Sequence, residues 1–206
     1  MGIDRLRFGT DGEGITTLVT FYGCPLKCHF CLNPQCHSII SDSMYLRSEE
    51  VFNRIVVDEL YYLATGGGIA FGGGEPLLYS EFIIDVLSHG ADKWNITIET
   101  SLNIPFKQVS ILLPYIHEMI IDIKDLNPRI YKSYTQSKND TVLENLKLLA
   151  CYGCVNKALV RIPLIRGYNT NRDIENSKNF LINLGYSKFD IFEYKTDNRY
   201  DGEREM

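Results

Sequence analysis

The sequence predicts an α/β protein, a partial, open (β/α)6 TIM-like barrel with parallel strands. Six short runs rich in β-branched and aromatic residues alternate with helical stretches, the order typical of a parallel sheet with right-handed crossovers. The fourth run, residues 119–123, is almost continuously apolar, as in a strand buried on both faces. A closed eight-stranded barrel takes about 250 residues. The chain has 206, so we expect the barrel to stay open.

The elements follow in order from local patterns. Residues 16–22, with the sequence TTLVTFY, predict the first strand. Residues 51–63 predict one helix, because Val51, Ile55, Val56, Leu60 and Leu63 share a helical face. Further strands are expected at residues 68–71, 94–98, 119–123, 158–162 and 189–192, and further helices at residues 80–88, 105–113, 141–152 and 173–184.

The composition excludes several classes of protein. Apolar residues make up 45% and charged residues 23%, as in an ordinary globular chain and unlike a disordered one. With 21 Lys and Arg against 26 Asp and Glu, the net charge is −5, so we expect no nucleic-acid partner. No apolar run reaches the about 18 residues of a membrane span, and the N-terminus lacks a signal-like apolar core. We therefore expect a cytoplasmic protein with no membrane partner.

Four of the six cysteines lie close together, at Cys24, Cys28, Cys31 and Cys36. In a reducing compartment such a group indicates metal binding or catalysis rather than disulfides. Thiolates are soft donors that suit zinc or an iron–sulfur cluster. Zinc needs a fourth ligand, which Cys36 or His37 could supply. A cluster held by three thiolates would leave one iron open for a small ligand, so both groups fit this spacing.

Polar or cysteine-rich segments follow five of the six predicted strands. In parallel α/β sheets the ligand site lies at the carboxyl ends of the strands, so we expect these segments to meet at one mouth. They are the cysteine loop after the first strand, residues 72–76 (GGGEP) after the second, residues 99–101 (ETS) after the third, residues 122–124 (DIK) at the fourth and residues 193–195 (EYK) after the sixth.

Two motifs in this order resemble the radical S-adenosylmethionine (SAM) superfamily: Cys24-x3-Cys28-x2-Cys31 after the first strand, and Gly73-Gly74-Glu75-Pro76 after the second. The pair favours an iron–sulfur cluster over zinc. Within the superfamily the chain is most similar to the glycyl-radical-enzyme activases, such as pyruvate formate-lyase activating enzyme. The further blocks that carry this resemblance are residues 11–15 (DGEGI), 21–28 (FYGCPLKC), 32–34 (LNP), 99–101 (ETS), 122–124 (DIK) and 161–169 (RIPLIRGYN).

The resemblance implies a single radical SAM domain over residues 1–206, with the cluster loop at residues 23–37 and no ferredoxin-type insert. It implies one [4Fe–4S] cluster with Cys24, Cys28 and Cys31 as its ligands, and SAM bound to the open iron. These cysteines and Lys124 are the implied catalytic residues. The implied SAM contacts are Phe30 beside the adenine, Gly73 and Gly74 as close backbone, Glu75 at the amino group, Thr100 at the carboxylate, and Asp122 and Lys124 at further polar groups.

Some residues stay unassigned or depart from the family pattern. Lys195 stands where the family usually has a histidine. Cys36 is left over, and Cys151 and Cys154 lie at a predicted helix end without a second pair of ligands, so we assign none of the three a metal.

The resemblance implies an oxidoreductase that cleaves SAM reductively to a 5′-deoxyadenosyl radical. That radical would take a hydrogen atom from a glycine of a partner glycyl radical enzyme, and a flavodoxin or ferredoxin would supply the electron. A second hypothesis is a radical SAM enzyme that modifies a ribosomal peptide or a small molecule, such as a deazaguanine precursor. A third is a non-catalytic iron–sulfur or zinc module.

Overall fold

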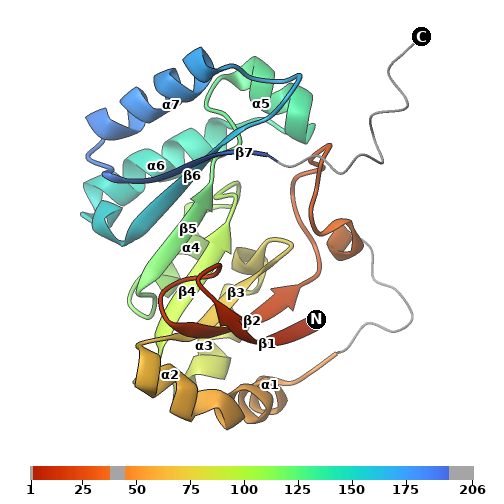
Figure 1. Cartoon of the computed structure of the whole chain (residues 1–206), viewed down its shortest axis with the longest axis vertical. Coiled ribbons are helices and arrows are strands. Elements are labelled where there is room, and N and C mark those ends of the chain that lie inside the picture. The colour runs from red at the N-terminus through yellow and green to blue at the C-terminus, as the bar shows by residue number, and fades with distance from the viewer. Residues whose placement is uncertain (1, 38–44, 195–206) are drawn as a thin grey trace.

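The computed structural model describes residues 2–37 and 45–194 of the chain and shows one sheet flanked by helices (Figure 1). Strands β2 to β7 run parallel in chain order, so the six predicted parallel strands are confirmed. The strands are β1 (Gly2–Phe8), β2 (Ile15–Phe21), β3 (Gly68–Gly73), β4 (Asn95–Thr100), β5 (Glu118–Asp122), β6 (Ala158–Leu164) and β7 (Lys188–Glu193).

The first strand, β1, was not predicted from the sequence. It pairs antiparallel with β2 at one edge of the sheet. Its pattern is obscured by charged residues and by an irregularity between Asp4 and Arg7, where Leu6 has a φ of 57°. A residue with positive φ interrupts the alternation of side chains that identifies a strand in a sequence.

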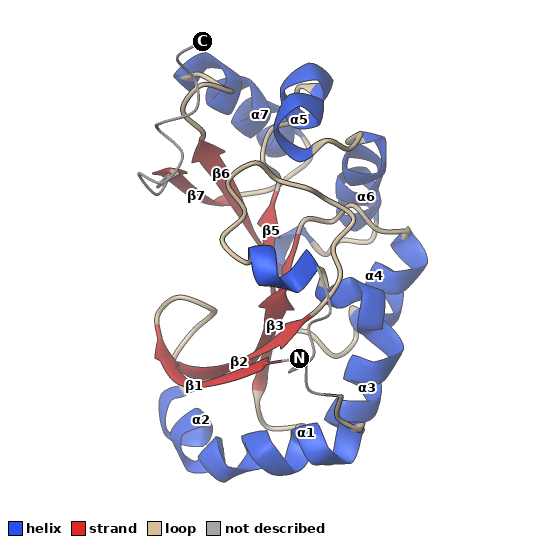
Figure 2. Ribbon diagram, turned by 90° about the vertical axis from the view of Figure 1, so that its right-hand side faces the viewer, coloured by secondary structure: helices blue, strands red, loops and turns tan. Residues whose placement is uncertain are grey.

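The helices lie along the outer side of the curved sheet, and its inner side stays open between β1 and β7 (Figure 2). The open barrel is therefore confirmed. Helix α5 was not predicted. The helices are α1 (Ser48–Ile55), α2 (Glu59–Thr65), α3 (Ser80–Ser88), α4 (Phe106–Leu112), α5 (Pro128–Thr135), α6 (Asp140–Cys151) and α7 (Asn171–Asn183).

The single helix predicted over residues 51–63 is wrong, because a 3-10 turn at Val56–Asp58 separates α1 from α2. The turn rotates α2, so that Leu60 is 76% exposed while Tyr62 is buried. It also buries the carboxylate of Asp58, which accepts hydrogen bonds from Arg5 of β1. The buried carboxylate of Asp58, paired with the half-exposed Arg5, and the buried Tyr62 thus replace the leucines of the predicted apolar face.

The core lies between the sheet and its outer helices. Strands β3 and β5 are buried along nearly their whole length, as their apolar sequences predict. None of the helices in the described parts of the chain combines the length and apolar character that a membrane crossing needs.

Candidate active site

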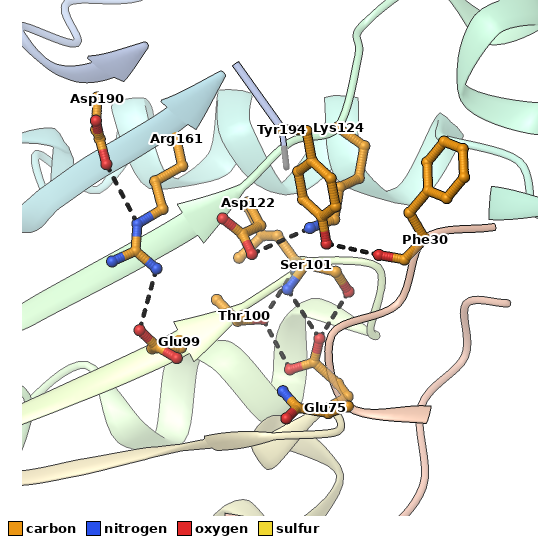
Figure 3. Close-up of polar contacts among 12 residues, drawn as sticks. Phe30, Glu75, Glu99, Thr100, Ser101, Asp122, Lys124, Arg161, Asp190 and Tyr194 are labelled. Carbon is orange, nitrogen blue, oxygen red and sulfur yellow. Dashed lines mark hydrogen bonds and ion pairs between the residues drawn. The ribbon is translucent and has the colours of Figure 1, made fainter. Parts of the chain in front are cut away.

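The carboxyl ends of the parallel strands meet at one mouth, as the sequence predicts (Figure 3). Thr100 at the end of β4 donates a hydrogen bond to Glu75 beyond β3, and Lys124 beyond β5 pairs with Asp122. The Tyr194 hydroxyl, beyond β7, donates to the carbonyl of Phe30 in the cluster loop at 2.7 Å, across 164 positions of sequence. Lys195 lies outside the described residues.

The cluster loop is hydrogen-bonded to the end of helix α5 and to the turn that follows it. Backbone groups of the loop pair with the last turn of the helix and with the turn that follows it. The bonds run from the Lys27 amide to the Thr135 carbonyl at 2.9 Å, from the His29 amide to the Tyr134 carbonyl at 3.0 Å, and from the Ser137 hydroxyl to the Pro25 carbonyl at 3.0 Å. Helix α5 therefore fixes the segment that carries the cysteines.

The thiols of Cys24, Cys28 and Cys31 are all partly buried. Burial raises the pKa of Cys24 to about 12, and Glu75 and the other two thiols add to this rise. Burial also raises the pKa of Cys28, while the positive charge of Lys124 acts in the opposite direction. The three thiols thus lie within electrostatic reach of one another, and a metal bound by them has to displace their protons.

The glycines after β3 bring this strand close to the cluster loop. A Cβ on Gly74 would lie 2.2 Å from the carbonyl oxygen of Gly23, so no other residue fits there without a shift of backbone. The amide of Glu75 donates to the same carbonyl at 2.7 Å. Gly73 has a φ of 89°, a conformation that other residues adopt only under strain. The contact of Gly73 and Gly74 with SAM stays a prediction.

Glu75 is fully buried, and its carboxylate accepts four hydrogen bonds. The donors are the Thr100 hydroxyl at 2.7 Å, the Ser101 hydroxyl at 2.7 Å, the Ser101 amide at 3.0 Å and the Leu77 amide at 3.3 Å. Burial raises the pKa of Glu75, and the bonds from Ser101 and Thr100 oppose this rise. A carboxylate has about four lone-pair sites, so a ligand amino group would share or replace a donor. The predicted SAM contacts of Glu75 and Thr100 stay predictions.

Lys124 brings a buried positive charge to the mouth. Its ammonium lies 3.1 Å from the carboxylate of Asp122, as expected for residues that share a face, although its own φ is 58°. Burial acts against the charge on Lys124, but Asp122 and Cys28 outweigh it and raise the pKa of Lys124 above its ordinary value. Lys124 is therefore charged at neutral pH, as the contact of an anionic group requires.

An aromatic cluster adjoins Cys28. Phe30, Tyr134 and Ile165 form a small buried core on which Tyr168 and Tyr194 pack. The hydroxyl of Tyr134 is buried and has no hydrogen-bond partner among the described residues. A buried polar group without a partner is costly, so a group bound at the mouth would relieve it.

A second charged network crosses the inner side of the sheet. The Arg161 guanidinium of β6 donates to the Glu99 carboxylate at 3.1 Å and to the Thr10 carbonyl at 2.8 Å, and it lies 3.5 Å from Asp190 of β7 (Figure 3). Burial raises the pKa of Glu99, and the charge of Arg161 opposes this. Arg161 thereby joins three strands and the β1–β2 turn.

Sequence reasoning expected the segments with Ser101 and Tyr194 at the mouth but gave these two residues no role, and it did not place Tyr134 there at all. Tyr134 was missed together with α5, although Asn127 and Pro128 carried the signal of a helix start: the Asn127 side chain accepts from the Arg129 amide. Tyr194 stood in a noted segment, but its bond to Phe30 depends on the curvature of the sheet and has no local signal.

The residues present fit an iron–sulfur cluster by the chemistry of their donors. Within residues 2–37 and 45–194, no three Cys, His, Asp or Glu side chains are grouped as ligands of one metal ion. The fit therefore rests on three thiols in one loop, which are soft donors suited to iron–sulfur groups. Lys124 and the unpaired Tyr134 hydroxyl offer polar contacts beside them to a further ligand.

The profile of the radical SAM superfamily matches residues 18–181. The (2S)-3-sulfopropanediol dehydratase activating enzyme of Klebsiella oxytoca is 29% identical over 235 residues, covering 84% of this chain and 74% of the relative. The pyruvate formate-lyase 2-activating enzyme of Escherichia coli is 28% identical over 194 residues, covering 79% and 65%. The indoleacetate decarboxylase activating enzyme of Tractidigestivibacter scatoligenes is 27% identical over 176 residues. The match covers only 55% of the length of that relative.

Solved structures share the fold. SuiB of Streptococcus suis, bound to its precursor peptide SuiA, aligns with 89% of this chain and 42% of SuiB, with a TM-score of 0.65 and 20% identity. A domain of pyruvate-formate lyase-activating enzyme from Bacteroides vulgatus aligns with 65% of this chain and 87% of that domain, with a TM-score of 0.55 and 28% identity. The likeness to SuiB shows the fold alone.

Proposed function

We propose a function from one premise: the chain belongs to the radical SAM superfamily, whose profile matches residues 18–181. Proteins of this superfamily use SAM and a [4Fe–4S] cluster held by three cysteines. We propose that Cys24, Cys28 and Cys31 are those ligands, and that the protein is a glycyl-radical-enzyme activase. The observation that carries the assignment of ligands is the placement of these three thiols at the mouth of the open barrel, within electrostatic reach of one another.

When bound, the cluster held by Cys24, Cys28 and Cys31 would supply an electron to SAM, and SAM would supply the group that abstracts a hydrogen atom from the substrate. The residues of the chain itself position the ligands and hold the segments of the site in place. Lys124 keeps its positive charge beside Asp122 and offers it to an anionic group such as the methionyl carboxylate. Glu75 and its donors fix the ends of β3 and β4, and Tyr194 fixes the cluster loop. Because the reacting groups are held in fixed positions, the entropy cost of bringing separate reactants together is reduced.

The names of the relatives support an activase. The relatives from Klebsiella and from Escherichia coli, which cover 84% and 79% of this chain, are both activating enzymes. In this proposal the substrate is a glycine in a loop of a glycyl radical enzyme. The proposed electron donor is a flavodoxin or ferredoxin, and the proposed compartment is the cytoplasm, because thiolate ligands require reducing surroundings.

The test is anaerobic reconstitution of the cluster, followed by dithionite and SAM. We expect 5′-deoxyadenosine, and with a suitable glycyl radical enzyme a glycine-centred doublet in electron paramagnetic resonance. The Cys28→Ser variant should give neither. Formation of 5′-deoxyadenosine without any glycyl radical, but with modification of a peptide, would replace the activase by a peptide-modifying enzyme. Material that binds one zinc and no sulfide would exclude radical SAM chemistry.

A further inference from the structure

Two stretches of the chain carry positive charge and no negative charge. Residues 23–37 and 126–139 contain no Asp or Glu, although the whole chain has 26 of them and a net charge of −5. The four cations in these stretches are Lys27, Arg129, Lys132 and Lys138, and all four are exposed. We call them the basic surface.

The fold brings the two stretches together. Bonds from the Lys27 amide to Thr135 and from the Ser137 hydroxyl to Pro25 place the cluster loop against the end of α5 and the turn after it. Three of the four cations line a single open groove of about 310 Å³, together with Pro128, Asn139 and Asp140: they are Arg129, Lys132 and Lys138. Asp140 is the one carboxylate in that lining.

The charges of the basic surface are not neutralised within the described part of the chain. Every ion pair found there involves other cations, such as Arg5, Arg7 and Arg161. With Asp140 as the one carboxylate in the groove, the basic surface therefore offers a net positive charge to a partner. Arg129 and Lys132 lie on the exposed face of α5, whereas Tyr131 and Tyr134 lie on its buried face, and Tyr134 packs in the aromatic cluster at the mouth. The basic surface is therefore directed away from the aromatic cluster.

We propose that the basic surface is the docking site of the electron donor, a small one-electron carrier protein with an acidic rim around its redox group. This inference rests on the proposed function. In the complex the carrier is oxidised by one electron, and the cluster held by the cysteine loop is reduced by one. A carrier docked on the basic surface leaves the mouth free for the protein substrate.

Charge complementarity is the physical reason for choosing this partner. Transient electron-transfer complexes bury little surface, below about 1,200 Å², so a few uncompensated charges dominate their formation. Opposite charges steer the two proteins together and raise the association rate at low salt.

The test uses charge reversal with a matched control. The variant Lys132→Glu/Lys138→Glu changes two charges of the basic surface. The control Lys93→Glu/Lys188→Glu makes the same change at exposed lysines by the amino ends of β4 and β7, the opposite end of the sheet. A reduced flavodoxin is the probe. Calorimetry measures its binding to cluster-loaded protein, and stopped-flow absorbance measures its oxidation at several salt concentrations.

We expect the Lys132→Glu/Lys138→Glu variant to bind flavodoxin at least about tenfold more weakly at low salt, with a flatter salt dependence. The control pair should stay within about twofold of the wild type. Cleavage of SAM driven by dithionite should be the same in all three proteins, because dithionite needs no docking.

Three results would overturn the proposal. One is unchanged flavodoxin binding in the variant, and another is an equal loss in the control pair. The third is a loss of glycyl-radical formation with dithionite, which would assign the surface to the protein substrate. If the wild type itself cleaves no SAM with dithionite, the proposed function fails, and this result is distinct from the other three.

Discussion

At the scale of single residues, the cysteines of the loop differ from Cys151 in their surroundings. The thiols of Cys24, Cys28 and Cys31 are partly buried near the mouth, whereas Cys151 is exposed at the end of α6. Replacement of any one loop cysteine by serine should abolish stable cluster binding, because a hard hydroxyl is a poor substitute for a thiolate. Iron and sulfide analysis with visible absorption checks this. Cys151→Ser is the control, and an equal loss of iron there would contradict the assignment.

The bond from Tyr194 to the Phe30 carbonyl makes a second prediction at this scale. Tyr194→Phe keeps the ring and removes the donor of this 2.7 Å bond. We expect a loss of about 1 kcal/mol in local stability, which is about a fivefold rise in opening of the loop. Hydrogen exchange over residues 28–31 measures it. Tyr152→Phe, at an exposed tyrosine just after α6, is the control. Unchanged exchange in Tyr194→Phe would mean that the bond does not hold the loop.

At the scale of elements, Gly72 near the end of β3 and Gly74 just after this strand differ in what a side chain would meet. A Cβ on Gly74 meets backbone at 2.2 Å, whereas one on Gly72 meets the far end of the Glu99 side chain at 3.0 Å, which can move. We expect Gly74→Ala to lower the free energy of unfolding by about 3 kcal/mol and Gly72→Ala by about 1 kcal/mol. Denaturant titration measures both. If Gly74→Ala cost no more than Gly72→Ala, the cluster loop at Gly23 would be able to shift without a loss of stability.

The contact between β1 and the turn before α2 predicts a pH dependence. Hydrogen bonds and charge from Arg5 hold the pKa of Asp58 below its ordinary value of 3.8. A carboxyl whose folded pKa is depressed stabilises the fold above its unfolded pKa and loses this effect as pH falls through the folded value. The free energy of unfolding should therefore fall more steeply below about pH 4 in the wild type than in Asp58→Asn. Asp92→Asn, at an exposed position, should keep the wild-type slope.

The parallel strands and four of the helices could be predicted because each carries its own local signal. The run at 119–123 is apolar except for Asp122, and it forms β5 within one residue of the expected bounds. The pair α1 and α2 could not be predicted, since the break at Val56–Asp58 depends on the ion pair between Asp58 and Arg5, which β1 brings from far away in sequence. The spacing of apolar residues within 51–63 gives no information about a distant partner such as Arg5.

At the scale of the whole molecule, ligand binding should report on the assembled mouth. Because SAM is expected to bind both the cluster and Lys124, it should stabilise the loaded protein only. At a concentration of 100 times its dissociation constant, a ligand adds about 2.7 kcal/mol, which corresponds to a rise of about 5–10 °C in Tm for a chain of this size. Scanning calorimetry with and without iron chelation measures this. A similar rise in chelated protein would place SAM binding away from the cluster.

The convergence of the site could be predicted from topology, but its internal pairing could not. Parallel strands carry Glu75, Thr100 and Lys124 to one end, and motif order alone suffices for that. The four donors around Glu75 and the bond from Tyr194 to Phe30 depend on the twist of the sheet, which sets distances that no motif contains.

The described sheet ends in two strands, β1 and β7, that do not pair with each other. A closed cylinder admits only what fits through its rim, so a polypeptide would have to be threaded in by a free end. A sheet with a permanent seam can instead take in a bent segment sideways while both of its ends stay anchored in the parent protein. The unpaired edges of the described sheet are therefore compatible with the internal glycine loop that the proposed function takes as its substrate.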